Sequence, residues 1–150
     1  MKRLLAALIP VAFVGGSFWG SSTSTAPHQR NIQEVRDEGL VNGSRMQNGK
    51  TPAYDEHVAD VCAHQHAVRM YREGQLRHST NSELVGCLGG GKVIGENVGY
   101  TGSLNEAHEA KLRSSSHRRI IHGSWSRMGT GVVVDEYGGW WTAELFWRRA

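Results

Sequence analysis

The sequence predicts a single domain of the α+β class. Small and apolar residues recur at the spacing of one helix face between Asp55 and Gly74. Near the end of the chain, two strand-like runs, 128–135 and 140–147, flank the turn residues 136–139, which is the pattern of an antiparallel hairpin. Because 150 residues are enough for one hydrophobic core, we expect one domain that contains both helices and strands.

The helix predicted from Asp55 to Gly74 has a face made mostly of small residues. That face consists of Ala59, Cys62, Ala63, His66, Ala67, Met70 and Tyr71. Because these side chains are small, the element that packs on them is expected to approach the helix backbone closely. We interpret His66 as a core histidine with a hydrogen-bond partner. His64 points the other way and shares an outer face with His57, where nothing in the sequence supports a metal site.

The other predicted elements are shorter. Residues 31–40 are polar, with apolar residues at helical spacing, which predicts a short helix. Residues 41–50 contain two Asn-Gly pairs, which predict a loop. Residues 92–100 favour a strand interrupted by glycines, and residues 105–113 are rich in Ala, Glu, Leu and Lys, which favours a second helix.

The first 25 residues are predicted to be a signal peptide or an N-terminal anchor with a Ser/Thr-rich linker, and residues 26–150 are predicted to be the folded domain. Lys2 and Arg3 precede the apolar run Leu4–Val14. This run is too short to span a bilayer but suits the apolar region of a signal peptide. We therefore expect export, a secreted or cell-surface location, and no membrane-spanning helix after processing.

The charge of the chain argues against a nucleic-acid partner. Without Lys2 and Arg3, the formal net charge falls from +3 to +1. Nucleic-acid binding needs Lys and Arg side chains concentrated on one face, so this class of function is excluded.

The chain contains two cysteines, Cys62 and Cys87. An even count in an exported chain favours one disulfide, and two free thiols are the alternative. A bridge that closes a loop of this length contributes about 3 kcal/mol to stability in the chain-entropy model.

Three polar residues in separate parts of the chain are candidates for one site. His78 follows the end of the long predicted helix, Glu96 lies in the glycine-flanked strand, and His117 follows the second predicted helix. Glycines around a carboxylate let another backbone or a ligand approach closely. These residue types fit an acid/base pair, a divalent metal site that favours Zn²⁺ or Cu²⁺, or a buried polar network. The residues alone do not distinguish the three.

Several motifs occur in a characteristic order. They are Leu76-Arg77-His78-Ser79, Gly95-Glu96-Asn97-Val98-Gly99, Ser114-Ser115-Ser116-His117-Arg118, Met128-Gly129-Thr130-Gly131-Val132 and Trp141-Thr142-Ala143-Glu144-Leu145-Phe146. In this order and spacing the chain resembles the CAP superfamily (the cysteine-rich secretory, antigen 5 and pathogenesis-related proteins), in particular its short bacterial secreted SCP-like members. The resemblance covers residues 31–148 and implies an α-β-α sandwich, with a mostly antiparallel central sheet between helical layers.

The resemblance also implies a cleft. In that family a cleft commonly holds two His and two Glu, and the matching positions here are His78, Glu96, His117 and Ser114. Ser114 stands where many members have the second Glu. Three further positions also depart from the family pattern. They are Lys111, where relatives often have Trp, Ile120, where they often have Asn, and Glu144, where they often have Gln.

We therefore expect an exported CAP-domain binding module whose His/Glu cleft takes a divalent metal such as Zn²⁺, a lipid or an extracellular partner. One alternative is a metal-dependent hydrolase in which His78 and His117 hold the ion and Glu96 is the general base. The other alternative is a structural domain that its His/Glu network stabilises. No catalytic residue is assigned outside the hydrolase alternative.

Overall fold

The structure is a computed structural model that describes residues 28–150. The predicted signal peptide or anchor, residues 1–25, lies outside the described residues. Within the described part, no helix combines the length and apolar character needed to cross a membrane.

Five helices and four strands make up the described chain. The helices are α1 (Ile32–Gln47), α2 (His57–Glu73), α3 (Asn81–Leu88), α4 (Leu104–Arg113) and α5 (Ser115–Ile121), and the strands are β1 (Tyr54–Asp55), β2 (Lys92–Thr101), β3 (Arg127–Val134) and β4 (Trp140–Arg149). The strand order in the sheet is β1-β3-β4-β2. The short β1 runs parallel to β3, whereas β3 with β4 and β2 with β4 are antiparallel. The predicted α+β class, the long helix, the second helix and the terminal hairpin are confirmed.

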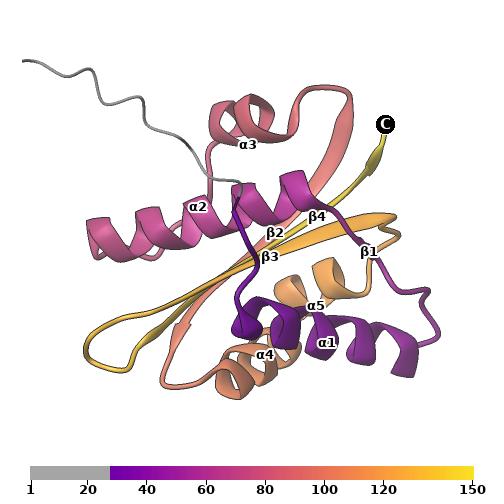
Figure 1. The fold of residues 1–150 in the computed structure, drawn as a ribbon. Helices are drawn as coiled ribbons and strands as arrows, with labels where there is room; N and C mark the ends of the chain where they lie inside the picture. Colours follow the sequence, from indigo (N-terminus) through magenta and orange to yellow (C-terminus); the bar gives the residue numbers. More distant parts are fainter. Residues whose placement is uncertain (1–27) are drawn as a thin grey trace, which may run out of the picture.

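The helices cover both faces of the sheet (Figure 1). Helix α2 packs on β3 and β4 and carries α3 beside it, whereas α1, α4 and α5 pack against the opposite face. The expected α-β-α sandwich, with a mostly antiparallel sheet between helical layers, is therefore confirmed. Strand β2 lies at one edge of this sheet.

Helix α2 lies in backbone contact with β3, as its small residues predict. A β-carbon added to Gly129 would come within 2.1 Å of the carbonyl carbon of Ala59, and one added to Gly131 within 2.2 Å of that of Ala63. Only glycine therefore fits at these strand positions. His66, on the same face of α2, is buried, and its Nε2 lies 2.8 Å from the carbonyl oxygen of Arg77, which confirms it as a core histidine with a partner.

The predicted disulfide is present. Cys62 of α2 is bonded to Cys87 of α3, across a sequence separation of 25 residues. The bridge fixes the short helix α3, whose residues are otherwise mostly exposed or half-buried, to the longest helix of the domain.

The helix predicted for residues 31–40 is confirmed, but the loop predicted for residues 41–50 was wrong over most of its length. Helix α1 continues to Gln47, through the segment predicted to be a loop, and Asn42 holds it there by two hydrogen bonds with the backbone of Ala53. The apolar residues Ile32 and Val35 are exposed. The buried face of α1 instead contains Glu34, Asp37, Val41, Ser44 and Arg45. Tertiary hydrogen bonds to polar side chains thus override the local turn signal.

Candidate functional site

The predicted site residues come from three parts of the fold. His78 lies in the loop between α2 and α3, Glu96 lies in the edge strand β2, and His117 lies in α5. Ser114 lies between α4 and α5, as the C-cap residue of the first helix and the N-cap residue of the second. The sequence did not predict α5, so His117 belongs to a helix rather than to the loop expected after α4.

The structure brings His78 and Glu96 together. The Nδ1 atom of His78 lies 2.9 Å from Oε2 of Glu96, and the same oxygen accepts a hydrogen bond of 2.8 Å from the backbone N–H of Ser79. His78 is exposed, whereas Glu96 is buried. The loop after α2 is therefore tied to the edge strand through one carboxylate oxygen.

The other oxygen of Glu96 has no hydrogen-bond partner. Oε1 is buried, and Nε2 of His66 lies 3.8 Å from it, but that nitrogen already faces the Arg77 carbonyl. Burying a carboxylate oxygen without a partner is costly. Glu96 therefore retains the capacity to accept a donor or to bind a cation.

His117 approaches the edge strand from its other face. Neighbouring residues of a strand point to opposite faces of the sheet, and Glu96 and Asn97 follow this rule. Glu96 meets the His78 loop, whereas Asn97 donates from Nδ2 to the carbonyl oxygen of His117 at 3.2 Å. The backbone of His117 and the loop of His78 thus meet neighbouring residues of β2.

The His117 side chain bonds to serine and not to Glu96. Its Nδ1 atom lies 2.9 Å from Oγ of Ser114, which in turn lies 3.0 Å from Oγ of Ser116. Burial lowers the pKa of His117, and repulsion from His78 and Lys111 adds to this effect. The neutral imidazole that results is the form that binds a metal ion.

The glycines of the Gly-Glu-Asn motif serve packing on the face opposite to Glu96. A β-carbon on Gly95 would lie 2.7 Å from the ring of Trp125, and one on Gly99 would lie 2.9 Å from Oγ1 of Thr142. The interpretation that they leave the Glu96 carboxylate accessible does not describe this geometry, because Glu96 is only 7% exposed.

Beneath the His117 side of the sheet lies a charged network that the sequence did not predict. Lys111 donates from Nζ to Oε1 of Glu144 at 2.7 Å and to Thr142 at 3.0 Å, and both charged residues are buried. Asn97 donates to the second oxygen of Glu144 at 3.3 Å. Lys111 and Glu144, two of the positions that depart from the family pattern, therefore form an ion pair with each other.

A second group of imidazoles and a carboxylate was also missed. Among residues 28–150, one set of three His, Cys, Asp or Glu side chains has ligand atoms that all lie within 4.8 Å of one another, and it consists of His28, Glu34 and His64. The trio of His78, Glu96 and His117 does not meet this distance. No sequence motif joins His28, Glu34 and His64, because they lie in the N-terminal segment, in α1 and in α2.

Sequence comparison does not identify a relative. No protein-family model matches the chain, and no curated protein matches its sequence. The fold, however, matches solved structures.

An outer surface protein from Borrelia burgdorferi superposes with a TM-score of 0.71 at 14% identity, over 83% of this chain and 100% of that one. An extracellular SCP-domain protein from Bacillus anthracis matches with a TM-score of 0.67 at 18% identity, over 78% of this chain and 40% of that one. A cysteine-rich secretory protein from Staphylococcus aureus matches with a TM-score of 0.66 at 20% identity, over 87% of this chain and 44% of that one. The chain thus spans less than half of the Bacillus and Staphylococcus proteins, and its fold is that of the SCP-like domains of the CAP superfamily.

Proposed function

We propose that the protein is an exported binding module whose cleft at His78, Glu96 and His117 binds a divalent cation. The observation that carries this proposal is the buried Oε1 atom of Glu96, which has no hydrogen-bond partner although the second oxygen of the same carboxylate has two. A carboxylate oxygen in this state gains a favourable contact when a cation arrives, because the cost of its burial has already been incurred.

The donor set supports a transition metal. Two imidazoles and a carboxylate are ligands that Zn²⁺ and Cu²⁺ accept, and the lowered pKa of His117 leaves its ring neutral near pH 7. Nδ1 of His117 is taken by Ser114, so Nε2 is the free nitrogen. Because the three side chains do not lie within ligand distance of one another, direct binding by all three requires a movement of the His117 ring relative to the His78–Glu96 pair.

A cavity next to the site offers room for further groups of a ligand. It has a volume of about 250 Å³ and is lined in part by Ser79, Glu83, Arg69 and the disulfide. The backbone N–H of Ser79 is the one that bonds Glu96, so the cavity borders the loop that holds the carboxylate. Lipids and extracellular proteins are the other ligand classes that we expect. In this proposal, they would bind at the cavity beside the Ser79 loop.

Export is supported by two independent observations. The N-terminal basic pair and apolar run have the pattern of a signal peptide, and the structural neighbours are described as an outer surface, an extracellular and a secretory protein. We expect residues 1–27 to direct a reporter phosphatase that is active only outside the cytoplasm. A fusion protein that stays in the cytoplasm and shows no phosphatase activity contradicts export.

The cation site is tested by isothermal titration of Zn²⁺ into the purified protein and its His78→Ala/His117→Ala variant. We expect one binding event to disappear in the double variant, and the Glu96→Gln variant to bind at least tenfold more weakly, since Gln retains an acceptor for Ser79 but lacks the charge. His57→Ala is the matched control, because His57 is an exposed histidine of α2 outside both clusters.

Two outcomes contradict the proposal. If Zn²⁺ binds the wild type and the His78→Ala/His117→Ala variant identically, the cleft is not a metal site. A lower melting temperature of the same variant, with no effect of Zn²⁺ on either protein, favours instead the structural interpretation, in which His78 and Ser79 bond Glu96 to hold the loop on β2.

A further inference from the structure

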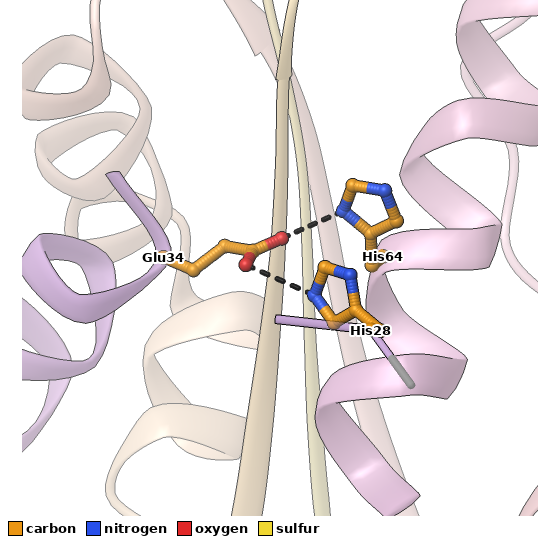
Figure 2. A group of neighbouring side chains, drawn as sticks. All are labelled: His28, Glu34 and His64. Carbon is orange, nitrogen blue, oxygen red and sulfur yellow. Dashed lines mark hydrogen bonds and ion pairs between the residues drawn. The ribbon is translucent and has the colours of Figure 1, made fainter. Parts of the chain in front are cut away.

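We propose that His28, Glu34 and His64 form a separate site for a divalent transition metal, distinct from the cleft at His78. Figure 2 shows the two imidazoles facing the same carboxylate, one on each oxygen. Nε2 of His28 lies 3.1 Å from Oε2 of Glu34, and Nδ1 of His64 lies 2.7 Å from Oε1. The three ligand atoms come from the start of the described chain, the first turn of α1 and the middle of α2.

The Glu34 carboxylate is fixed by the backbone. Its Oε2 accepts a hydrogen bond of 2.8 Å from the N–H of Asn31, as part of the capping box of α1, and its Oε1 accepts one of 3.3 Å from the N–H of Val132 in β3. An ionised carboxylate oxygen has roughly two acceptor positions. Each oxygen therefore uses one position on the backbone and turns the other towards an imidazole, which is the arrangement of a preorganised metal ligand.

Within residues 28–150, only the two imidazoles are within ion-pair distance of the Glu34 carboxylate. Arg30, which is close in sequence, instead pairs with Glu38 at 2.7 Å and with Asp55 at 2.8 Å. Glu34 itself is fully buried. Burial raises its pKa, but the hydrogen bonds from His64 and from the Asn31 N–H outweigh this effect and lower the pKa overall. The result is a buried carboxylate whose only side-chain partners at ion-pair distance among residues 28–150 are two imidazoles, which also bind metals.

The distances lie near those of a metal site. Tetrahedral Zn²⁺ with bonds of about 2.0–2.1 Å holds neighbouring ligand atoms about 3.3 Å apart. The separations between His28 and Glu34 and between His64 and Glu34 are 3.1 and 2.7 Å. An ion bound between the rings and the carboxylate thus requires the rings to move outward by about 0.2 to 0.6 Å. Each neutral imidazole then carries its proton on the ring nitrogen that does not bind the ion.

The two imidazole rings are partly exposed to solvent, so an ion can reach the site. Their planes are stacked, with centroids 4.1 Å apart and an interplanar angle of 28°. The side chain of His28 is 15% exposed and that of His64 is 29% exposed, whereas Glu34 is closed to solvent. Solvent therefore reaches both rings, and water can complete a coordination shell that has three protein ligands. The bound ion would join the start of the described chain to α1 and α2.

The test uses Zn²⁺ alone and the full-length protein, in three forms: wild type, His28→Ala/His64→Ala and His78→Ala/His117→Ala. We expect one Zn²⁺ equivalent to bind the His78→Ala/His117→Ala protein and to raise its melting temperature by several degrees, and we expect His28→Ala/His64→Ala to bind one equivalent fewer than the wild type. Because the two pairs of variants are independent, failure of this site and failure of the cleft are read separately. His57→Ala, on the exposed face of α2, is the matched control and should bind as the wild type does.

A second variant keeps the test valid if the alanine protein does not fold. His64→Gln retains a hydrogen-bond donor for Glu34 but removes the imidazole, so we expect it to fold and to bind Zn²⁺ at least tenfold more weakly in the His78→Ala/His117→Ala background. Co²⁺ provides a direct readout, because four-coordinate Co²⁺ gives intense visible absorption bands. The proposal is overturned if the His78→Ala/His117→Ala protein binds no Zn²⁺, or if binding and the Co²⁺ bands survive in His64→Gln.

Discussion

Gly131 of β3 and Ala63 of α2 meet so closely that a β-carbon on the glycine would lie 2.2 Å from the carbonyl carbon of Ala63. The atoms it would meet are helix backbone, which cannot rotate away as a side chain can. The contact lets α2 lie directly on the sheet, and it places His66 and the Cys62 end of the disulfide at the sheet surface.

We therefore expect Gly131→Ala to destabilise the domain by about 3 kcal/mol, because the strand and the helix must separate to admit the methyl group. Urea denaturation measures the change. Gly39→Ala is the matched control, since a β-carbon at this helical position meets nothing within 4 Å, and it should raise the free energy of unfolding by about 0.5–1 kcal/mol. Equal effects of the two substitutions contradict the close contact.

The ion pair between Lys111 and Glu144 predicts a strong coupling. Both side chains are buried, and Lys111 provides the only ion pair of Glu144 among residues 28–150. Lys111→Met leaves a buried carboxylate without its counterion, and we expect a loss of about 3–5 kcal/mol. Adding Glu144→Gln should recover most of this loss, because the amide removes the charge and keeps an oxygen for Asn97. A double-mutant cycle measures the coupling, and additive losses contradict it.

The disulfide between Cys62 and Cys87 gives a further prediction. Removing it by Cys62→Ala/Cys87→Ala should reduce the free energy of unfolding by about 3 kcal/mol, because the unfolded chain regains the freedom of a loop of 25 residues. Alanine is chosen because Cys62 is buried and serine would place a hydroxyl there. Thermal unfolding in dithiothreitol should bring the wild type to the variant's level. Wild-type stability that is unchanged by the reductant contradicts the assigned contribution.

The parts of the fold that the sequence predicted correctly are those with a regular apolar pattern. The stripe of α2 and the alternation of the hairpin both describe surfaces that pack on the core, so their periods identify the elements. Helix α1 has no such apolar pattern on its buried face, because that face carries Glu34, Asp37 and Arg45. Arg45 is buried by donating to the carbonyl oxygens of Thr51, Ile121 and Gly123. Ile121 and Gly123 lie 76 and 78 residues away in sequence, and no local pattern predicts such partners.

The same distinction applies to the candidate sites. His78 and Glu96 belong to motifs with a family order, and the structure places them in contact. His28 and His64 belong to no motif, and their partner Glu34 resembles an ordinary first-turn acid of a capped helix. The capping box of Asn31 and Glu34 is local, but the path of the chain that brings His28 and Glu34 next to His64 of α2 depends on tertiary structure.

Asp37 predicts how stability changes with pH. Its carboxyl group is fully buried, and neither oxygen has a hydrogen-bond partner. Burial raises the pKa of Asp37 to about 8, and the nearby Glu144 adds to the rise while Lys111 opposes it. Between its ordinary pKa near 4 and this value, the folded protein holds a proton that the unfolded chain has lost. Stability therefore falls as the pH rises through this window.

Asp37→Asn places a permanently neutral group at the same position. We expect it to match the wild type near pH 3.5, where both states of the wild type are protonated, and to melt at a higher temperature near pH 8.5. Burial also raises the pKa of Asp60, to about 7, but both proteins share that residue, so the difference between their curves reports Asp37 alone. Glu109→Gln, at an exposed position on α4, should leave the pH dependence of the melting temperature unchanged. Parallel curves for Asp37→Asn and the wild type would show that the Asp37 carboxyl group titrates in the folded protein as it does in the unfolded chain.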